Sequence, residues 1–206
     1  MNRAERANPL LEPVTRAPPR RVAVIGAGTI GPDIGYYLKS ALPGLELVLI
    51  DLRQEAIDKA LDRLAGYAEK AVARGKMKKD EAAAVLAGIS GSTDYAALAG
   101  ADWVIEAATE DLALKRRIFA AIESHVSADA AITSNTSSLP AERLFSQVQH
   151  PGRCTVTHFF APAWRNPAVE VVDWPRADPA LVGWLRRIFA QTGKVPLVTA
   201  DVPCFM

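Results

Sequence analysis

The sequence predicts an α/β protein built on a doubly wound, mostly parallel β-sheet. Short apolar runs rich in β-branched residues alternate with longer segments of helical periodicity along the chain. A turn with three glycines follows the first apolar run, and an acidic residue ends the second run. Parallel strands that are covered by helices on both faces are apolar on both faces, which explains these nearly continuous apolar runs.

Composition and charge disfavour several functional classes. The chain has 206 residues, 50% of them hydrophobic, which is enough for one large domain or for a domain and a fragment. A formal net charge of +1 gives no electrostatic argument for a nucleic-acid or membrane partner. No apolar run approaches the ~20 residues of a membrane span, and the N-terminus has no secretory apolar region. Cys154 and Cys204 form no C-x-x-C pair, so we expect a cytoplasmic protein without a metal site.

The first half of the chain is punctuated by helix start and stop signals. Pro32 lies early in the first expected helix, where its missing N–H costs least, and Pro43-Gly44 ends that helix. The next helix is amphipathic. In this half we expect strands at residues 22–25, 45–50, 89–92 and 102–107, and helices at 28–42, 54–75, 80–86 and 94–98.

The second half continues the alternation. A polar turn and Leu139-Pro140 lead into a short helix, and Gly193 ends the last helix. In this half we expect strands at residues 130–134, 154–157, 168–173 and 195–199, and longer helices at 112–124 and 178–192.

Three regions follow from these elements. Residues 1–20 are rich in arginine and proline and are predicted to be a flexible N-terminal extension. Residues 21–200 form the α/β domain. Residues 202–206 are apolar and follow a strand without a closing element, so we expect residues 201–206 to begin a linker to a further domain that is absent from this chain.

The glycine turn has the spacing G-x-G-x-x-G of a Rossmann-type fold. Gly26 permits a tight strand-to-helix turn, Gly28 lets a pyrophosphate approach the backbone, and Gly31 lets the helix pack close to the strand. Thr29 and Ile30 lie where the N–H groups of the helix N-terminus favour an anion. A purely structural βα turn would have the same spacing, so the motif needs its context.

Asp51 supplies part of that context. It lies about 20 positions after Gly31, at the end of the second strand, where a carboxylate accepts hydrogen bonds from the ribose hydroxyls of NAD. It would repel the 2′-phosphate of NADP, although Arg53 could meet such a phosphate. Asp51 could also cap the following helix. We favour NAD because the acidic residue occupies the strand end itself.

Other polar residues are expected at the same carboxyl edge of the sheet. His158 is suited to be a general base near neutral pH, and Glu170 on the next strand could orient its ring. Ser137 could hold a substrate oxygen. The alternatives are a structural histidine, an unrelated glutamate and an ordinary turn serine. The basic residues 76–79 could meet a nucleotide phosphate or form a solvated turn.

Four blocks together resemble the NAD-binding domain of L-3-hydroxyacyl-CoA dehydrogenases, including 3-hydroxybutyryl-CoA dehydrogenases. They are Gly26-Ala-Gly-Thr-Ile-Gly31, Val104-Ile-Glu-Ala-Ala-Thr-Glu110, Ser134-Asn-Thr-Ser-Ser138, and His158-Phe-Phe-Ala-Pro162 with Val169-Glu-Val171. The blocks occur in the order and spacing of the family, and the resemblance covers residues 20–206.

The resemblance implies an NAD-dependent oxidation of a 3-hydroxyacyl-CoA to a 3-oxoacyl-CoA, or its reverse, in fatty-acid β-oxidation. His158 would take the proton of the 3-hydroxyl as hydride leaves C3, Glu170 would orient His158, and Ser137 would bind the substrate oxygen. Glu110 and Lys115 match family positions near the nicotinamide half of NAD. Asn135 matches the asparagine of the family's polar turn. The family has a helical C-terminal domain that completes the cleft and forms a homodimer, so this chain should bind NAD with little turnover.

Three departures from the family pattern leave the substrate open. Ala161 replaces the usual asparagine, residues 163–167 are unlike the usual run, and Cys204 replaces a glycine. Arg165 could pair with a carboxylate, so a dehydrogenase of a free hydroxy acid such as gulonate or carnitine is an alternative. A nucleotide-binding module that has lost catalysis is another.

Overall fold

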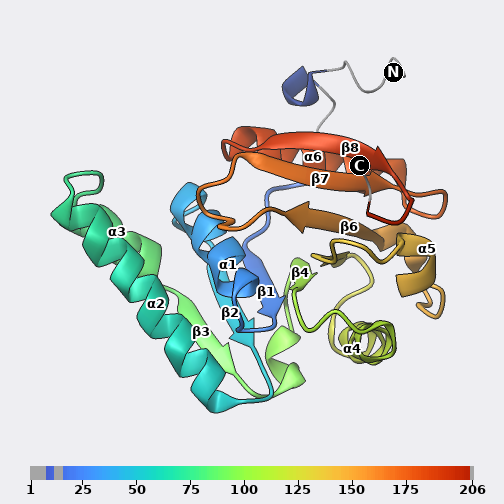
Figure 1. Ribbon diagram of the computed structural model, residues 1–206, viewed down its shortest axis with the longest axis horizontal. Coiled ribbons are helices and arrows are strands. Elements are labelled where there is room, and N and C mark those ends of the chain that lie inside the picture. The colour runs from blue at the N-terminus through green and yellow to red at the C-terminus, as the bar shows by residue number, and fades with distance from the viewer. Residues whose placement is uncertain (1–7, 12–15, 205–206) are drawn as a thin grey trace.

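The computed structural model describes residues 8–11 and 16–204 and contains one eight-stranded sheet (Figure 1). The strand order is β3-β2-β1-β4-β5-β6-β7-β8. Strands β1 to β6 run parallel, β7 is antiparallel to β6, and β8 is parallel to β7. The strands are β1 (Arg21–Ile25), β2 (Glu46–Ile50), β3 (Ile89–Ser92), β4 (Trp103–Glu106), β5 (Ala131–Ser134), β6 (Cys154–Phe159), β7 (Ala168–Asp173) and β8 (Val195–Ala200).

The connections between the strands contain the helices. The α-helices are α1 (Ile30–Ala41), α2 (Gln54–Ala73), α3 (Lys79–Leu86), α4 (Leu112–His125), α5 (Ala141–Leu144) and α6 (Pro179–Gln191), and the 3₁₀ turns are η2 (Pro9–Leu11), η3 (Tyr95–Leu98) and η4 (Pro151–Arg153). Figure 1 shows α1 and α2 on one side of the parallel strands and α4 on the other. The predicted doubly wound fold is therefore confirmed.

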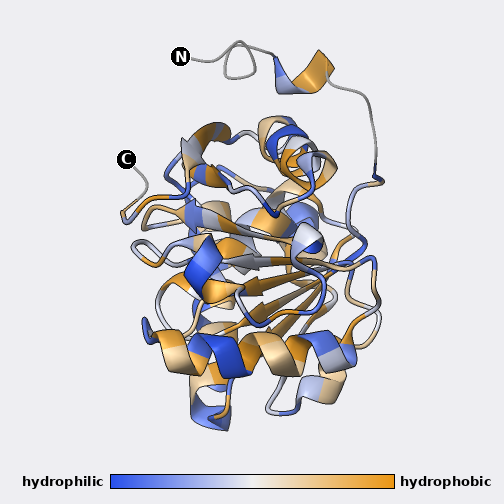
Figure 2. Ribbon diagram, turned by 90° about the vertical axis from the view of Figure 1, so that its right-hand side faces the viewer, coloured by the Kyte–Doolittle hydropathy of each residue, from blue (hydrophilic) through white to orange (hydrophobic). Residues whose placement is uncertain are grey.

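The core consists of the apolar strands and the inner faces of the helices. In Figure 2 the central strands are strongly hydrophobic, whereas the outer helices alternate between polar and apolar residues. Aromatic rings fill both sides of the sheet. Phe159 packs between Tyr37 of α1 and Phe189 of α6, and Phe145 packs against Phe119 of α4. Burying such rings stabilises each layer by about 1.5–3 kcal/mol per side chain.

Two boundaries differ from the sequence prediction in ways that affect the site. Helix α1 begins at Ile30 rather than near residue 28, so Gly28 belongs to the turn. Strand β6 was predicted to end before His158, but it continues through Phe159 because the antiparallel ladder with β7 extends it. His158 therefore lies within a strand and directly opposite Glu170.

The N-terminal segment is partly fixed to the domain. Arg16 donates to the carbonyl oxygen of Asp102 at 3.0 Å, and the Trp184 indole donates to the carbonyl oxygen of Ala17 at 3.0 Å. The sequence assigned residues 1–20 to a flexible extension, whereas residues 16–20 are hydrogen-bonded to the sheet and α6. Residues 1–7 and 12–15 of that prediction lie outside the described residues.

The C-terminal segment is also tied to the domain as far as it is described. The Asp201 carboxylate accepts hydrogen bonds from the backbone N–H groups of Ala141 at 2.6 Å and Glu142 at 2.9 Å, and so caps α5. Cys204 adopts a φ of +64°, a left-handed conformation that glycine tolerates best. The glycine that the family pattern has at this position thus fits the local backbone, and Cys204 occupies it with strain. Residues 205–206 of the expected linker lie outside the described residues.

Candidate active site

The strand order reverses between β1 and β4, and this is where a doubly wound sheet binds its ligand. The polypeptide leaves β1 toward β2 on one side, while β4 pairs with β1 on the other side. The crevice at the carboxyl ends of these two strands is lined by Gly26 after β1 and by Ala107 after β4. Two cavities meet there, and both are bordered by Ala107 and Ala108.

The first cavity has a volume of about 370 Å³ and is built around the glycine turn. Gly26 has a φ of +106°, and a Cβ atom placed there would lie 2.5 Å from the carbonyl oxygen of Ala107. A Cβ atom on Gly31 would lie 2.0 Å from the carbonyl oxygen of Gly26. At Gly28 a Cβ atom would meet nothing within 4 Å. Gly26 and Gly31 are therefore required by the fold, whereas Gly28 leaves open space beside an exposed backbone, as a bound pyrophosphate needs.

Asp51 lines the same cavity and is fixed in place by the backbone. Its Oδ2 accepts a hydrogen bond from the N–H of Ala27 at 3.0 Å, and its Oδ1 accepts one from the N–H of Arg53 at 3.0 Å. Arg53 lies 3.9 Å away through Nε and is largely exposed. Asp51 thus links the glycine turn to the entrance of α2, and its carboxylate is held at the strand end where a ribose would lie.

The second cavity has a volume of about 340 Å³ and collects most of the other predicted site residues. It is bordered by side chains from the ends of β4, β5 and β6 and from the N-terminus of α1. Those of the sequence prediction that line it are Ile30, Glu110, Lys115, Asn135, Ser137 and His158. Thr29 is exposed beside it, and Gly31 and Glu170 lie behind the lining.

His158 and Glu170 form a hydrogen-bonded pair at the wall of this cavity. The Nδ1 atom of His158 lies 2.7 Å from Oε2 of Glu170. The glutamate side chain is 1% exposed, and the histidine side chain is 16% exposed. When Nδ1–H donates to the carboxylate, Nε2 is the basic ring nitrogen. The antiparallel pairing of β6 and β7 therefore gives the arrangement of a general base and the group that orients it.

Asn135 joins three strands beneath the polar turn. Its N–H donates to the carbonyl oxygen of Glu106 at 2.7 Å, and its Oδ1 accepts from the N–H of Phe159 at 2.8 Å. The side chain thus fixes the backbone next to His158. Ser137, two residues further, is exposed on the same cavity. Asn135 therefore holds the serine turn and the histidine strand in one arrangement.

Lys115 was expected to lie near the cofactor, and its ammonium group is in fact deeply buried. Its side chain is 1% exposed, and Nζ lies 2.7 Å from Oε1 of the fully buried Glu106. Nζ also lies 3.3 Å from Oε2 of Glu110. The sequence singled out Lys115 and Glu110, but their buried partner Glu106 was not among the predicted site residues. The signal available was its place at the end of a buried strand, nine positions before Lys115.

Glu110 is stabilised as a carboxylate. Burial by itself raises the pKa of Glu110, but the hydrogen bonds from Thr136 and Ser138 and the charge of Lys115 outweigh burial and hold the pKa below its ordinary value. A carboxylate that two hydroxyls and an ammonium hold at the mouth of the second cavity is a fixed negative charge. This negative charge favours a neutral or positively charged part of a ligand over an anionic one at that point.

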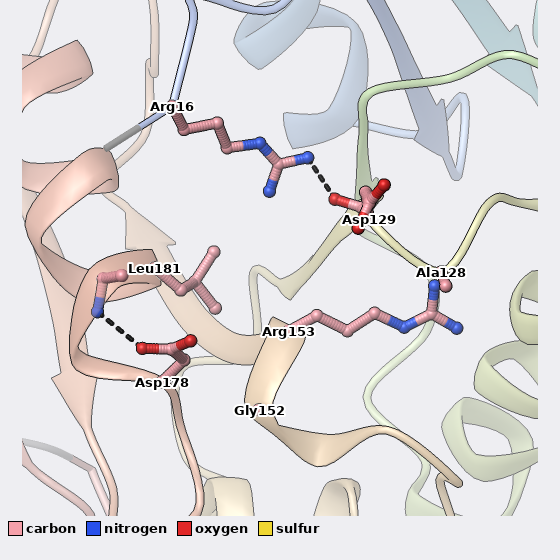
Figure 3. Close-up of a pocket in the computed structure, with 8 residues that line it drawn as sticks. Arg16, Ala128, Asp129, Gly152, Arg153, Asp178 and Leu181 are labelled. Atoms are coloured by element: carbon pink, nitrogen blue, oxygen red, sulfur yellow. Dashed lines mark hydrogen bonds between the residues drawn. The ribbon is translucent and has the colours of Figure 1, made fainter. Parts of the chain in front are cut away.

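A larger cavity of about 440 Å³ lies at the opposite edge of the sheet (Figure 3). Three of the charged residues that line it already make hydrogen bonds within the fold. Arg16 is hydrogen-bonded to the backbone of Asp129, Arg153 donates to the carbonyl oxygen of Ser127 at 2.5 Å, and Asp178 caps α6. This cavity is therefore a gap between loops whose polar groups serve the fold, and it is not our candidate site.

The residues at the carboxyl edge fit a dinucleotide. The glycine turn leaves the space that a pyrophosphate requires, and the aligned carboxylate of Asp51 and the two joined cavities accommodate the two halves of such a molecule. Within the described ranges, three or more histidine, cysteine or acidic side chains do not gather in a way that could hold a metal ion. In the same residues we find no helix long and apolar enough to cross a membrane. Fold and site together define a dinucleotide-binding oxidoreductase domain.

Comparison with known proteins gives the family. Residues 21–202 match the family model described as 3-hydroxyacyl-CoA dehydrogenase, NAD binding domain. The chain belongs to this family, and its cofactor is NAD.

Solved structures agree with the family model. The chain is 32% identical to 3-hydroxybutyryl-CoA dehydrogenase from Escherichia coli K12. The match covers 90% of this chain and 39% of that one, with a TM-score of 0.86. It is 31% identical to (S)-3-hydroxybutyryl-CoA dehydrogenase from Ralstonia eutropha, with 92% and 66% covered and a TM-score of 0.86. It is 28% identical to 5-formyl-3-hydroxy-2-methylpyridine 4-carboxylic acid 5-dehydrogenase, an NAD⁺-dependent dismutase, with 91% and 60% covered and a TM-score of 0.77. The chain thus spans between 39% and 66% of the lengths of these enzymes.

Proposed function

We propose that this domain serves the NAD-dependent oxidation of a 3-hydroxyacyl-CoA to a 3-oxoacyl-CoA, or the reverse reaction. The observation that carries the proposal is the His158–Glu170 pair, which lies on the cavity adjoining the glycine turn. NAD supplies the hydride acceptor. In the oxidation, the C3–H bond breaks with its electron pair as hydride, and the proton of the 3-hydroxyl passes to Nε2 of His158.

Each neighbour of His158 has a defined part in this proposal. Glu170 holds the ring through Nδ1 and offsets the charge of the imidazolium that forms. Ser137 donates a hydrogen bond to the substrate oxygen, and Asn135 fixes the strand that carries the histidine. Glu110 and Lys115 line the second cavity, where the nicotinamide half of NAD would lie.

A fourth cavity, beside α2, supports a CoA ester over a free acid. It has a volume of about 260 Å³ and is lined by aromatic rings and by cations of α2 and the segment that follows it. Trp164, whose ring centre lies 5.4 Å from that of Tyr67, forms one wall. The cations at its rim are Lys70, Arg74 and Lys76. Three cations beside aromatic rings suit a substrate tail with a nucleotide base and phosphates. Lys76 belongs to the basic cluster that the sequence singled out.

A free hydroxy acid is the second candidate substrate. Ala161 lines the second cavity where the family has an amide, Arg165 is exposed on the same loop, and a similar structure is named for a dehydrogenase of a pyridine carboxylic acid. In this case Arg165 would pair with the substrate carboxylate.

The two candidates are separated by steady-state rates. We expect an enzyme that contains this domain to oxidise 3-hydroxybutyryl-CoA with a higher kcat/KM than 3-hydroxybutyrate, gulonate or carnitine. In Arg74→Met the KM for the CoA ester should rise while the KM for NAD is unchanged. Arg165→Met is the matched control, since it removes a cation that would bind the substrate only if the substrate were a free hydroxy acid. Activity on free acids alone would overturn the first candidate.

We infer that the domain acts as part of a homodimeric, cytoplasmic enzyme of fatty-acid β-oxidation. The support is the likeness to 3-hydroxybutyryl-CoA dehydrogenases that are longer than this chain. Size-exclusion chromatography with light scattering on the longest expressed form tests the dimer, and a monomer at micromolar concentration would contradict it.

A further inference from the structure

Arg63 approaches the glycine turn from the middle of α2. Its Nη2 donates to the carbonyl oxygen of Gly28 at 2.7 Å and to that of Thr29 at 3.2 Å. The sequence pattern gave no reason to single out this residue, because it lies on a long amphipathic helix 32 positions after Gly31. The contact is therefore made only by the tertiary fold.

The guanidinium is held in this position by an anion on α1. Nε of Arg63 lies 3.9 Å from Oδ1 of Asp33, whose side chain is 7% exposed in the first turn of α1. The hydroxyl of Tyr67, one turn further along α2, donates to the same carboxylate oxygen at 3.1 Å. Asp33 thus places the cation and offsets its charge, which would otherwise be unfavourable beside the N-terminus of α1.

The two carbonyl contacts hold the direction in which the neighbouring N–H groups point, a direction that the helical backbone of Thr29 (φ −72°, ψ −53°) also favours. A trans peptide is planar, and its C=O and N–H bonds point in opposite directions. The carbonyls of Gly28 and Thr29 face Arg63, so the N–H groups of Thr29 and Ile30 point away from α2. Neither N–H donates a hydrogen bond to another described residue. These are the donors that the first turn of a helix offers to a phosphate.

We propose that Arg63 is a positioning residue for the NAD pyrophosphate, because it aims the Thr29 and Ile30 N–H groups and adds a positive charge behind them. Hydrogen bonding of a cation to the carbonyl side of a peptide also polarises that peptide and strengthens its N–H as a donor. The proposal rests on NAD binding and is independent of the acyl substrate. Its failure would leave the proposed reaction untouched.

The test is titration of the full chain with NADH and, by competition, with ADP-ribose and adenosine. In Arg63→Met we expect the Kd values for NADH and ADP-ribose to rise about tenfold or more, since charged hydrogen bonds are lost. The Kd for adenosine, which lacks the pyrophosphate, should stay within about twofold of the wild-type value. Arg63→Lys keeps the charge but loses the fork geometry, so its NADH affinity should lie between those of the wild type and Arg63→Met.

Lys59→Met is the matched control. Lys59 is an exposed cation one turn earlier on α2 that pairs with Glu55 at 2.5 Å. Its loss should leave all three affinities within about twofold of wild type, with thermal unfolding measured for each variant. Wild-type NADH affinity in Arg63→Met would overturn the proposal. So would an equal loss of adenosine and NADH affinity, because that would indicate a distorted adenosine pocket rather than a pyrophosphate effect.

Discussion

The two halves of the carboxyl edge are constructed in different ways. The half around the glycine turn consists of backbone groups, missing side chains and one fixed carboxylate, Asp51. The half around His158 consists of ionisable side chains from several strands, each held by another charged or polar group. The first half can be built by a continuous stretch of chain. The second exists only when β4, β5, β6 and β7 are assembled side by side.

This difference separates binding from chemistry. A change in the first half should alter affinity for the dinucleotide or the fold of the turn. A change in the second half should alter proton transfer or the stability of buried charges. Variants that affect one half and leave the other unchanged therefore test whether the halves are as independent as their construction indicates.

His158→Gln should have the largest effect and should be confined to the second half. Glutamine cannot accept and release a proton near neutral pH, so in an enzyme that contains this domain we expect kcat for the hydroxyacyl substrate to fall by about 10²–10⁴-fold. The Kd for NADH should change far less than kcat, because the substitution alters the wall of the second cavity and leaves the glycine turn and Asp51 of the first cavity intact. Stopped-flow turnover and NADH titration measure the two quantities. Unchanged turnover would contradict the general-base role.

Lys115→Met should destabilise the fold. It leaves Glu106 as a buried carboxylate without its ammonium partner, and breaking such a pair costs about 3–5 kcal/mol in the free energy of unfolding. Glu110→Gln is the control, because it changes the partly exposed partner of the same lysine and should cost less than about 1 kcal/mol. Urea unfolding measures both. Equal midpoints for Lys115→Met and wild type would show that the pair does not support the fold.

Gly26→Ala and Gly28→Ala should separate the two uses of glycine in the first half. Alanine at residue 26 meets the Ala107 carbonyl and a positive φ, so we expect a loss of about 2–3 kcal/mol in stability. Alanine at residue 28 meets no atom of the protein, so stability should stay within about 0.5 kcal/mol. NADH affinity should nevertheless fall, because the new methyl group occupies space beside the pyrophosphate. Full NADH affinity in Gly28→Ala would place the pyrophosphate elsewhere.

The smallest effect concerns a buried cation beneath the loop that follows His158. Lys194 donates to the carbonyl oxygen of Ala163 at 2.5 Å and lies 4.4 Å from the centre of the Tyr37 ring. Burial lowers the pKa of Lys194 to about 8. Between pH 8 and the ordinary lysine pKa of about 10.4, the unfolded chain binds more protons than the folded one, so stability should rise with pH.

The matched variant for this effect is Lys194→Met, which has no proton to lose at this position. Relative to it, the wild type should gain on the order of 1 kcal/mol in the free energy of unfolding from pH 8 to 10. The comparison uses the slopes with pH, because the variant also changes the packing. Parallel slopes would mean that Lys194 titrates normally.

The sequence alone determined the parallel half of the fold and the first half of the site. The period of the apolar runs, the G-x-G-x-x-G turn and Asp51 at a strand end are local patterns, because a glycine conformation or a strand end is set by a few neighbouring residues. The pairing of His158 with Glu170 was also predicted, since the two residues lie on strands joined by a short connection.

Only the tertiary structure decided the contacts between distant elements. The burial of Lys115 against Glu106, the contact of Arg63 with Gly28 and the capping of α5 by Asp201 join residues that no sequence period relates. Strand β6 extends past its predicted end because β7 pairs with it. Each of these contacts depends on the free energy of burying charges and backbone groups in the assembled sheet, which becomes defined only when all the layers are packed together.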